Sequence, residues 1–419
     1  MTGLSERTVP AVARQGRGRV HGLWLAIAVL TVTVAVSGCG TFDKVAGLFR
    51  KDNLNKPSEL PEFEPSLEIR QVWRKSFGKG TGKNYLKLHP LIDAGRLYVV
   101  DHKGDLGALS AEDGKKLWDI GIDTPITTGI SGAEDRITIG TDTGEVVALD
   151  AEQGTELWRR QLSSEVMAIG HPDLGVFVAR TNDSKVYGLD EVTGEIAWTA
   201  GRTAPVLTLR GQSKPLAAGG KAIVGYDDGK LVALSLVRGN VLWQTTIAVP
   251  EGRSELERMV DIDGAMRLQE GIIYVAGFHG RVAAVSLVDG RILWTRDLSS
   301  SMGLDIDDEY VFVTDAESNV WALDRRTGAS LWKQDKLKYR RLTAPAVVYD
   351  YVVVGDFEGY THWMDAEDGT FVARHRVDRK GTLSQPMVYA GRVYIAGNSG
   401  KYAALEPALD EVAEFEDFE

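Results

Sequence analysis

The sequence has a single cysteine and fewer basic than acidic residues. One cysteine among 419 residues excludes an internal disulfide bond. The formal net charge of -11 argues against a nucleic-acid partner, because affinity for phosphate backbones depends on clustered Lys and Arg. Two local basic runs, residues 336–341 and 374–380, are interpreted as solvated faces of hairpins. The seven His residues form no pair at metal-ligand spacing, and no Gly-x-Ser-x-Gly or phosphate-loop motif is present, which disfavours hydrolases and nucleotide enzymes.

Long apolar runs are also missing. The longest, residues 23–36, is shorter than the roughly 20 residues that span a bilayer, so a transmembrane anchor is the weaker alternative. Four arginines precede this run, and Ser37-Gly38-Cys39 follows it. A basic region, an apolar region and small residues in this order predict a signal peptide over residues 1–38.

The only cysteine, Cys39, directly follows that segment. Val36-Ser37-Gly38-Cys39 resembles a bacterial lipobox, in which the thiol is acylated and becomes the new N-terminus. The alternative is a buried or stray thiol. Several acyl chains anchor a protein durably, where one chain binds only marginally. By resemblance to the sorting rule of such lipoproteins, Gly40 after the cysteine favours the outer membrane, with the protein facing the periplasm.

Both flanks of the remaining chain lack periodicity. Residues 39–68 therefore form the expected lipidated, flexible tether. Residues 406–419 are strongly acidic and are expected to be a frayed tail, with a short binding motif as the alternative.

One pattern recurs between these flanks: a strand ending in Ala-Leu-Asp or a variant, followed by Gly-x-x-x-Trp. Six copies keep the same spacing between the glycine and the tryptophan, and they end at Trp118, Trp158, Trp198, Trp243, Trp294 and Trp332. A seventh copy has Ala373 in place of the tryptophan, and an eighth stops after residues 401–405. Intervals of 38 to 51 residues between successive tryptophans are typical of the four-stranded blades of a β-propeller.

The incomplete eighth copy has its missing strand at the other end of the chain. Residues 69–74 contain Trp73 without the strands that should precede it. We therefore predict an all-β, eight-bladed propeller of four-stranded antiparallel blades over residues 69–405. The N-terminal strand would pair with the C-terminal blade and close the ring. The repeated tryptophans are expected to fill the gaps between blades, not to bind ligand.

The form Ala148-Leu149-Asp150 to Trp158 resembles the blade motif of pyrroloquinoline-quinone (PQQ) propellers. With the lipobox, the chain is similar to the BamB family of outer-membrane protein assembly factors. Specific matches are residues 207–213, Leu-Thr-Leu-Arg-Gly-Gln-Ser, the segment 255–263, which ends in Asp-Ile-Asp, and residues 355–360. The resemblance implies a non-enzymatic protein that binds a periplasmic POTRA domain of the barrel-forming subunit BamA and helps insert β-barrel proteins into the outer membrane.

In that family the Leu-x-Leu-Arg and Asp-x-Asp positions contact the barrel subunit, which here implies Leu207, Leu209, Arg210, Asp261 and Asp263 as partner-binding residues. Both motifs fall in outer-to-inner crossovers of neighbouring blades, which emerge on one face of a propeller, and long loops on one face often bind partners. The leucines would be apolar anchors. Arg210 would pair with an acid of the partner, or with Asp261 or Asp263 in the same chain. Alternatively, the leucines tuck under their loop and the charges are merely solvated.

Two other functions remain open. A PQQ-dependent dehydrogenase shares the blade motif, but such enzymes need a calcium site and a carboxylate base, often with adjacent cysteines, and no second cysteine exists here. A propeller that binds sugar or peptidoglycan is the other alternative. We expect no cofactor and no metal. Unfolded outer-membrane substrates could also add a strand to an exposed blade edge.

Overall fold

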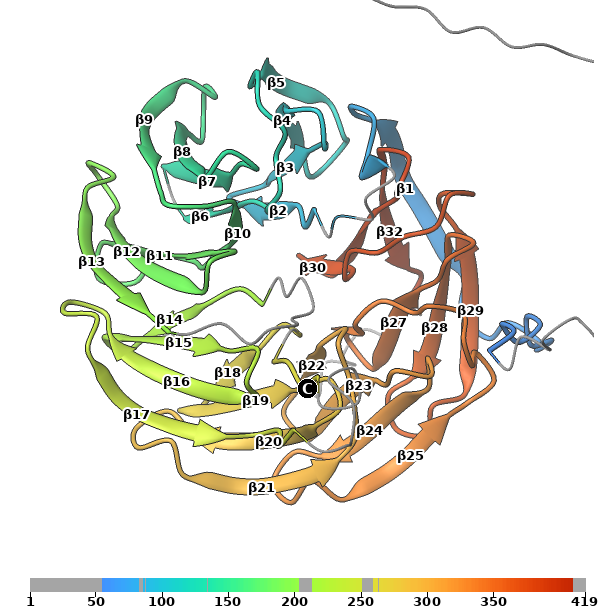
Figure 1. Cartoon of the computed structure of the whole chain (residues 1–419). Coiled ribbons are helices and arrows are strands. Elements are labelled where there is room, and N and C mark those ends of the chain that lie inside the picture. The colour runs from blue at the N-terminus through green and yellow to red at the C-terminus, as the bar shows by residue number, and fades with distance from the viewer. Residues whose placement is uncertain are drawn as a thin grey trace, which may run out of the picture. The chain divides into compact units, whose positions relative to one another are not determined.

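The computed structural model describes residues 55–82, 86, 88–133, 135–202, 213–250, 259–262 and 264–409. The chain divides into two units, Met1–Lys56 and Pro57–Glu419, and the fold below is that of the second unit. Its strands form eight antiparallel sheets of four strands each, arranged as a ring of blades (Figure 1). The predicted eight-bladed propeller is confirmed. Within the described residues, no helix is long and apolar enough to cross a membrane.

Blades 1 to 7 are each continuous in sequence and run from the innermost to the outermost strand. Blade 1 contains β2 (Leu91–Asp93), β3 (Arg96–Val100), β4 (Asp105–Ser110) and β5 (Lys116–Gly121); blade 2 contains β6 (Ser131–Ala133), β7 (Arg136–Gly140), β8 (Glu145–Asp150) and β9 (Glu156–Gln161). Blade 3 contains β10 (Val166–Ile169), β11 (Val176–Thr181), β12 (Lys185–Asp190) and β13 (Ile196–Gly201); blade 4 contains β14 (Leu216–Ala218), β15 (Lys221–Gly225), β16 (Lys230–Ser235) and β17 (Val241–Thr246). Blade 5 contains β18 (Arg267–Gln269), β19 (Ile272–Ala276), β20 (Arg281–Ser286) and β21 (Ile292–Asp297); blade 6 contains β22 (Leu304–Ile306), β23 (Tyr310–Thr314), β24 (Val320–Asp324) and β25 (Ser330–Gln334); blade 7 contains β26 (Ala346–Val348), β27 (Tyr351–Gly355), β28 (Tyr360–Asp365) and β29 (Phe371–Arg376).

Blade 8 joins the two ends of the propeller. Its inner strands are β30 (Met387–Tyr389), β31 (Arg392–Ala396) and β32 (Lys401–Pro407), and its outermost strand is β1 (Ile69–Ser76). β1 pairs antiparallel with β32, with Lys75 opposite Tyr402 and Trp73 opposite Ala404. In Figure 1 the blue β1 lies beside the red β32. The predicted closure of the ring by the segment around Trp73 is therefore confirmed.

The repeated tryptophans join each blade to the next. Each donates its indole N–H, over 2.6–3.2 Å, to a backbone carbonyl that follows the third strand of the next blade; the pairs are Trp73–Ala111, Trp118–Ala151, Trp158–Glu191, Trp198–Leu236, Trp243–Leu287, Trp294–Arg325 and Trp332–Ala366. The motif glycine of the next blade packs on the ring. Gly154, for example, has a φ of +72°, and a Cβ there would lie 2.7 Å from Trp118. The fixed spacing of the motif thus reflects contacts between blades.

Blade 7 lacks the motif tryptophan, but a tryptophan on its third strand keeps the combined side-chain volume the same. In the other blades the tryptophan lies opposite a small residue on the third strand, as Trp158 lies opposite Ala148. In blade 7 the two are exchanged, because Trp363 on β28 lies opposite Ala373 on β29. Trp363 is fully buried in a cluster that includes side chains of blade 8. The tryptophan and the alanine together therefore fill the gap between blades 7 and 8 with the same side-chain volume, but the tryptophan comes from the third strand.

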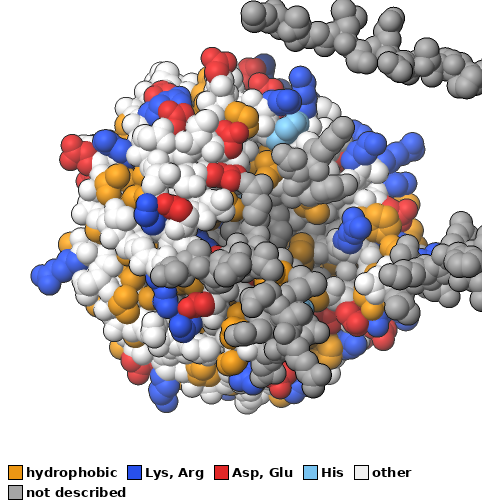
Figure 2. Space-filling model, in the orientation of Figure 1, with side chains coloured by type: hydrophobic (Ala, Val, Ile, Leu, Met, Phe, Trp, Pro, Cys, Tyr) orange, Lys and Arg blue, Asp and Glu red, His pale blue; other side chains and the backbone are white. Residues whose placement is uncertain are grey.

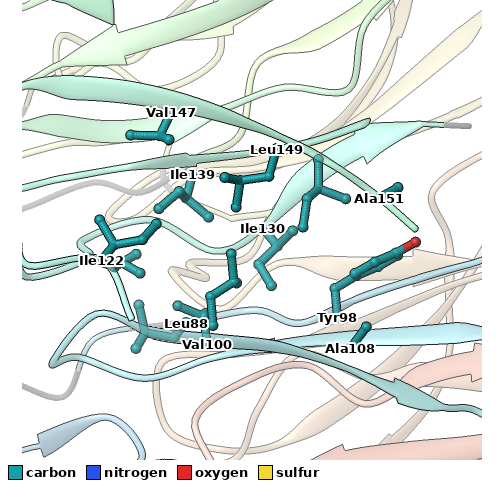
Figure 3. Packing of buried hydrophobic residues seen from close by; sticks show 13 residues of the cluster. Leu88, Tyr98, Val100, Ala108, Ile122, Ile130, Ile139, Val147, Leu149 and Ala151 are labelled. Atoms are coloured by element: carbon teal, nitrogen blue, oxygen red, sulfur yellow. The ribbon is translucent and has the colours of Figure 1, made fainter. Parts of the chain in front are cut away.

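Apolar side chains of adjacent sheets interdigitate between the blades. Figure 3 shows the cluster between blades 1 and 2, where Tyr98 and Val100 of β3 face Ile139 of β7 and Val147 and Leu149 of β8. Similar clusters lie around the ring. Because each sheet buries both faces, a single blade would expose its core.

The segment before β1 packs against the outside of blade 7. Ser58 donates its backbone N–H to the Lys338 carbonyl at 2.9 Å, and Leu67 donates its backbone N–H to the Val372 carbonyl at 3.1 Å. Phe63 stacks on Phe371 with ring centroids 5.5 Å apart. The sequence predicts that these residues belong to a flexible tether ending at residue 68. That boundary is wrong, because the described chain contacts the propeller from Ser58 onward.

Candidate functional site

Two crossovers of blades 3 to 5 contain the residues that the sequence analysis selected. Residues 202–215 connect β13 to β14, and residues 247–266 connect β17 to β18. Each runs from an outermost to an innermost strand, so both emerge on the same face of the ring, which we call the crossover face. Leu207, Leu209, Arg210 and Asp263 lie outside the described residues, as does Cys39. Asp261 is described.

The two crossovers meet at their ends. Ser213, directly after the undescribed part of the first crossover, donates its hydroxyl to the Gly264 carbonyl in the second, at 3.3 Å. Gly264 lies against Gly303 of the next crossover, where a Cβ on Gly264 would be 2.6 Å from the Gly303 Cα. Ser213 is itself buried. The hydrogen bond therefore fixes the end of one predicted contact loop against the other.

Asp261 is held at the base of this region. Its backbone forms an isolated antiparallel bridge with Phe278 in the β19–β20 turn, in which Phe278 donates its N–H to the Asp261 carbonyl at 2.7 Å. The neighbouring Ile262 is buried between blades 4 and 5, and a Cβ on Gly225 would come within 2.5 Å of it. The side chain of Asp261 is fully buried. The sequence predicts Asp261 as a partner-binding residue of a surface loop; in the structure its side chain lies beneath that surface.

A cleft of about 440 Å³ opens beside this bridge, between blades 4 and 5. Its floor is apolar, with Ile247, Ala248 and Val260 all buried, while Val249 is exposed at its edge. The rim is polar: Arg281 and Asp297 form an ion pair at 2.8 Å, and His279 completes the lining. An apolar floor with a polar rim suits an apolar side chain of a partner.

The His279 ring is fixed at this rim. Its Nδ1 lies 3.0 Å from the Met259 carbonyl, its ring stacks on Phe278 at 4.0 Å between centroids, and its backbone N–H bonds the Ser299 hydroxyl at 2.9 Å. No sequence pattern indicates His279, because a histidine in a hairpin turn has no characteristic spacing. Only the position of the turn beside residues 259–261 reveals it.

A cationic and aromatic cluster flanks the start of the first crossover. The Arg202 guanidinium lies 4.9 Å from the ring centre of Tyr226 and 3.2 Å from the Asp228 carboxylate. Arg180 packs on the same ring and pairs with Asp227. Burial raises the pKa of the Tyr226 phenol, and the two nearby guanidinium groups partly offset this. The cluster holds the chain rigidly where the predicted contact loop begins.

Lys214 extends inside the ring from the end of the first crossover. Its ammonium donates to the Ile130 carbonyl, near the inner edge of blade 2, at 2.9 Å. Burial, and to a lesser extent repulsion by Arg267, lowers its pKa to about 8. Among the described residues, no group of three or more His, Cys, Asp or Glu side chains could hold a metal ion.

Comparisons with known proteins agree with this architecture. The family model for "Outer membrane protein assembly factor BamB" matches residues 70–119 and 102–334. A protein of that name from Pseudomonas aeruginosa is 38% identical over 91% of this chain and 98% of its own length, and one from Escherichia coli is 31% identical over 89% and 96%.

Solved structures show the same fold. The crystal structure of BamB from Moraxella catarrhalis has a TM-score of 0.74 and is 26% identical, covering 81% of this chain and 100% of that one. A quinohemoprotein alcohol dehydrogenase from Comamonas testosteroni, at 12% identity and a TM-score of 0.63, shares the fold alone. The family match, the identities over nearly the whole chain and the closed eight-bladed ring together place this chain in the BamB family of outer membrane protein assembly factors.

Proposed function

We propose that this chain is a non-enzymatic scaffold, acylated on Cys39 and held on the periplasmic side of the outer membrane. It binds a POTRA domain of a BamA-like subunit and assists insertion of β-barrel proteins. Its homologues are named assembly factors, and its family membership supports the outer-membrane role.

The partner would bind the crossover face of blades 3 to 5. Leu207, Leu209, Arg210 and Asp263 would provide the contact. The observation that supports this most strongly is the Ser213–Gly264 hydrogen bond, which brings together two loops that are distant in sequence. The cleft beside them, with exposed Val249 at its edge, offers a place for an apolar side chain of the partner.

The burial of Asp261 gives it a different role within the same site. A buried carboxylate contacts a partner poorly but can hold a guanidinium from below. The sequence leaves both Asp261 and Asp263 as possible intrachain partners of Arg210. We propose Asp261 as that partner because of its burial. It would position the arginine without touching the other protein.

Co-purification from detergent-solubilised envelopes tests the proposal. Arg210→Glu or Leu207→Glu should reduce recovery of the barrel subunit at least tenfold while the thermal unfolding midpoint is unchanged. Lys103→Glu is the matched control, because Lys103 is exposed on the same face in blade 1. Undiminished recovery with both site variants would remove these residues from the interface.

A further inference from the structure

Among the described residues, most cations of the crossover loops lie in three neighbouring crossovers. The loops that leave blades 6, 7 and 8 carry, in residues 335–345, 377–386 and 77–82, seven Lys or Arg and two acids. The described parts of the other five crossovers carry two cations, Arg202 and Lys214. On a chain with a net charge of -11 this is a marked local reversal. Figure 2 shows Lys and Arg around the whole rim of this view, the side of β1 and β32 included.

Five of the seven cations are exposed and form no ion pair with another residue of the described chain. We call these five the cationic patch: Lys79, Lys336, Arg341, Arg379 and Lys380. The other two, Lys338 and Arg340, pair with Glu317 and with Asp356. The patch is therefore free to attract anions from outside the described chain.

Backbone hydrogen bonds make the three loops one continuous surface. The Phe357 N–H bonds the Arg340 carbonyl at 3.2 Å, and the Thr382 N–H bonds the Asp356 carbonyl at 3.1 Å. Asn398 then bonds the Gly381 carbonyl through its N–H at 2.9 Å and accepts from the Thr81 N–H at 3.1 Å. Hydrogen bonds therefore link the three loops that carry the patch, from blade 6 to blade 8.

An aromatic side chain projects within this surface. Phe357, in the β27–β28 turn, is 37% exposed, and the Arg340 guanidinium lies 5.1 Å from its ring centre. Exposed aromatic residues surrounded by cations are typical of surfaces that settle at the boundary between lipid headgroups and acyl chains.

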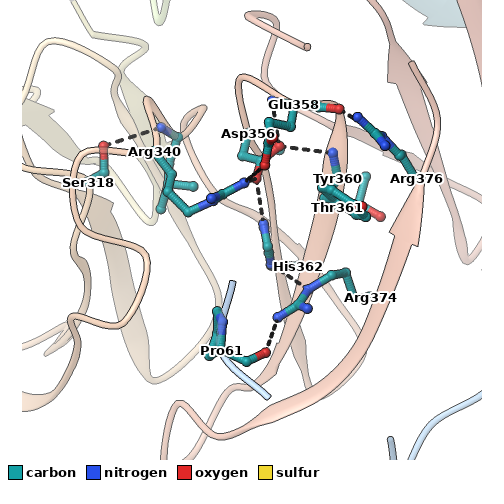
Figure 4. Close-up of polar contacts among 12 residues, drawn as sticks. Pro61, Ser318, Arg340, Asp356, Glu358, Tyr360, Thr361, His362, Arg374 and Arg376 are labelled. Carbon is teal, nitrogen blue, oxygen red and sulfur yellow. Dashed lines mark hydrogen bonds and ion pairs between the residues drawn. The ribbon is translucent and has the colours of Figure 1, made fainter. Parts of the chain in front are cut away.

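A buried polar network fixes this turn (Figure 4). Arg340 and His362 both bond the buried Asp356 carboxylate, at 2.7 and 3.0 Å. Burial raises the pKa of Asp356, but hydrogen bonds from His362 and Arg340 outweigh it and lower the pKa overall. Arg374 donates to His362 Nδ1 at 3.3 Å, so a neutral His362 carries its proton on Nε2 and donates it to Asp356.

The same network holds the chain that leads to the membrane anchor. Arg340 donates to the Ser58 carbonyl at 2.9 Å, and Arg374 donates to the Pro61 carbonyl at 2.8 Å. Ser58 also bonds the Lys336 carbonyl through its hydroxyl at 2.8 Å. The tether thus reaches the propeller on the crossover face, directly beside the cationic patch.

We propose that the cationic patch, together with Phe357, binds the anionic phospholipid surface to which the tether leads. This rests on the proposed acylation of Cys39. Eighteen residues separate Cys39 from Ser58, so the anchor holds the patch at high effective concentration near the headgroups. A lipid anchor alone does not fix which face of the propeller lies towards the bilayer, and a second contact would do so.

The chain's own acidic tail, residues 410–419, is the competing occupant. β32 runs from the crossover face to the opposite face, where Ala408 donates its N–H to the Glu68 carbonyl. The described chain therefore ends on the face opposite the patch, whereas Ser58 contacts the propeller beside it. The position of the tether favours the membrane.

Vesicle sedimentation tests the proposal on the mature chain, residues 39–419 with Cys39→Ser, without acyl chains. We expect binding to vesicles that contain 30% phosphatidylglycerol, little binding to pure phosphatidylcholine, and loss of binding at high salt. Arg379→Gln with Lys380→Gln should lower the partition coefficient roughly 25-fold, since each cation near an anionic surface contributes about fivefold. Phe357→Ser should lower it independently. The matched control is Lys115→Gln with Lys116→Gln, two exposed lysines on the opposite face.

Equal binding to both kinds of vesicle, or an unchanged partition coefficient in the patch variants, would overturn the proposal. Binding that appears only after residues 410–419 are deleted would identify the tail as the occupant and would also overturn it. No assembly subunit is present in this assay. A negative result would therefore count against the lipid-binding proposal and leave the partner-binding proposal untouched.

Discussion

The exchanged pair in blade 7 provides a quantitative test of how the blades pack. Trp363 is fully buried opposite Ala373, so Trp363→Ala should cost about 3–5 kcal/mol of unfolding free energy, as large-to-alanine core substitutions do. Ala373→Trp adds a second indole beside the first and should cost about 1–3 kcal/mol through overpacking. The double variant restores the arrangement of the other blades. It should be at least about 2 kcal/mol more stable than the sum of the single effects predicts.

Urea unfolding of the four proteins, followed by tryptophan fluorescence and far-UV circular dichroism, measures this coupling. The mirror-image exchange in blade 6, Ala322→Trp with Trp332→Ala, is the matched control and should show coupling of the same sign. If the two substitutions in blade 7 add within about 0.5 kcal/mol, the pair does not share one volume and this interpretation of the seam is wrong.

Three further predictions concern other contacts. Gly154→Ala should destabilise the fold by more than about 1 kcal/mol, because its φ is positive and a Cβ would strike Trp118; thermal unfolding would show a lowered midpoint. Lys214→Met should stabilise the protein at pH 7 by up to about 3 kcal/mol, since the folded state lowers the pKa of this ammonium from 10.5 to about 8. Burial of the charged ammonium lowers the unfolding free energy of the wild type by its full amount below pH 8, and this loss disappears as pH rises towards 10.5. The stability advantage of the variant, measured by urea unfolding, must therefore shrink over that range. Arg374→Ala removes a bond to the Pro61 carbonyl and one to His362 Nδ1, so limited proteolysis should cut residues 55–68 faster and the unfolding midpoint should fall.

The blade count and the ring closure were predictable because the repeat fixes local contacts. A tryptophan four residues after a glycine can fill a seam only if the next blade supplies its own glycine at the same place, so the spacing reports on contacts between blades. The strand with Trp73 lacks the strands that should precede it, and for the same reason this indicated that it pairs with the incomplete eighth copy at residues 401–405. The exchange of Trp363 and Ala373 was not visible, because sequence alone does not show which residues lie opposite each other.

The candidate site was predictable only in part. The alternation of outer and inner strands placed both loops on one face, but it did not show that Ser213 bonds Gly264, that Asp261 is buried, or that a cleft lies beside it. Such details depend on how side chains of neighbouring blades meet. The extent of the tether was also hidden, since residues 58–67 have no strand periodicity and are held by contacts with Arg340, Arg374 and Phe371.

Site-specific photo-crosslinking in cells tests the central claim most directly. Probes at positions 207 and 263 should join this chain to the periplasmic domains of a BamA-like subunit, while a probe at Val237, exposed on the opposite face, should not. Capture of that subunit from position 237 but not from positions 207 and 263 would show that the crossover face of blades 3 to 5 is not where the partner binds.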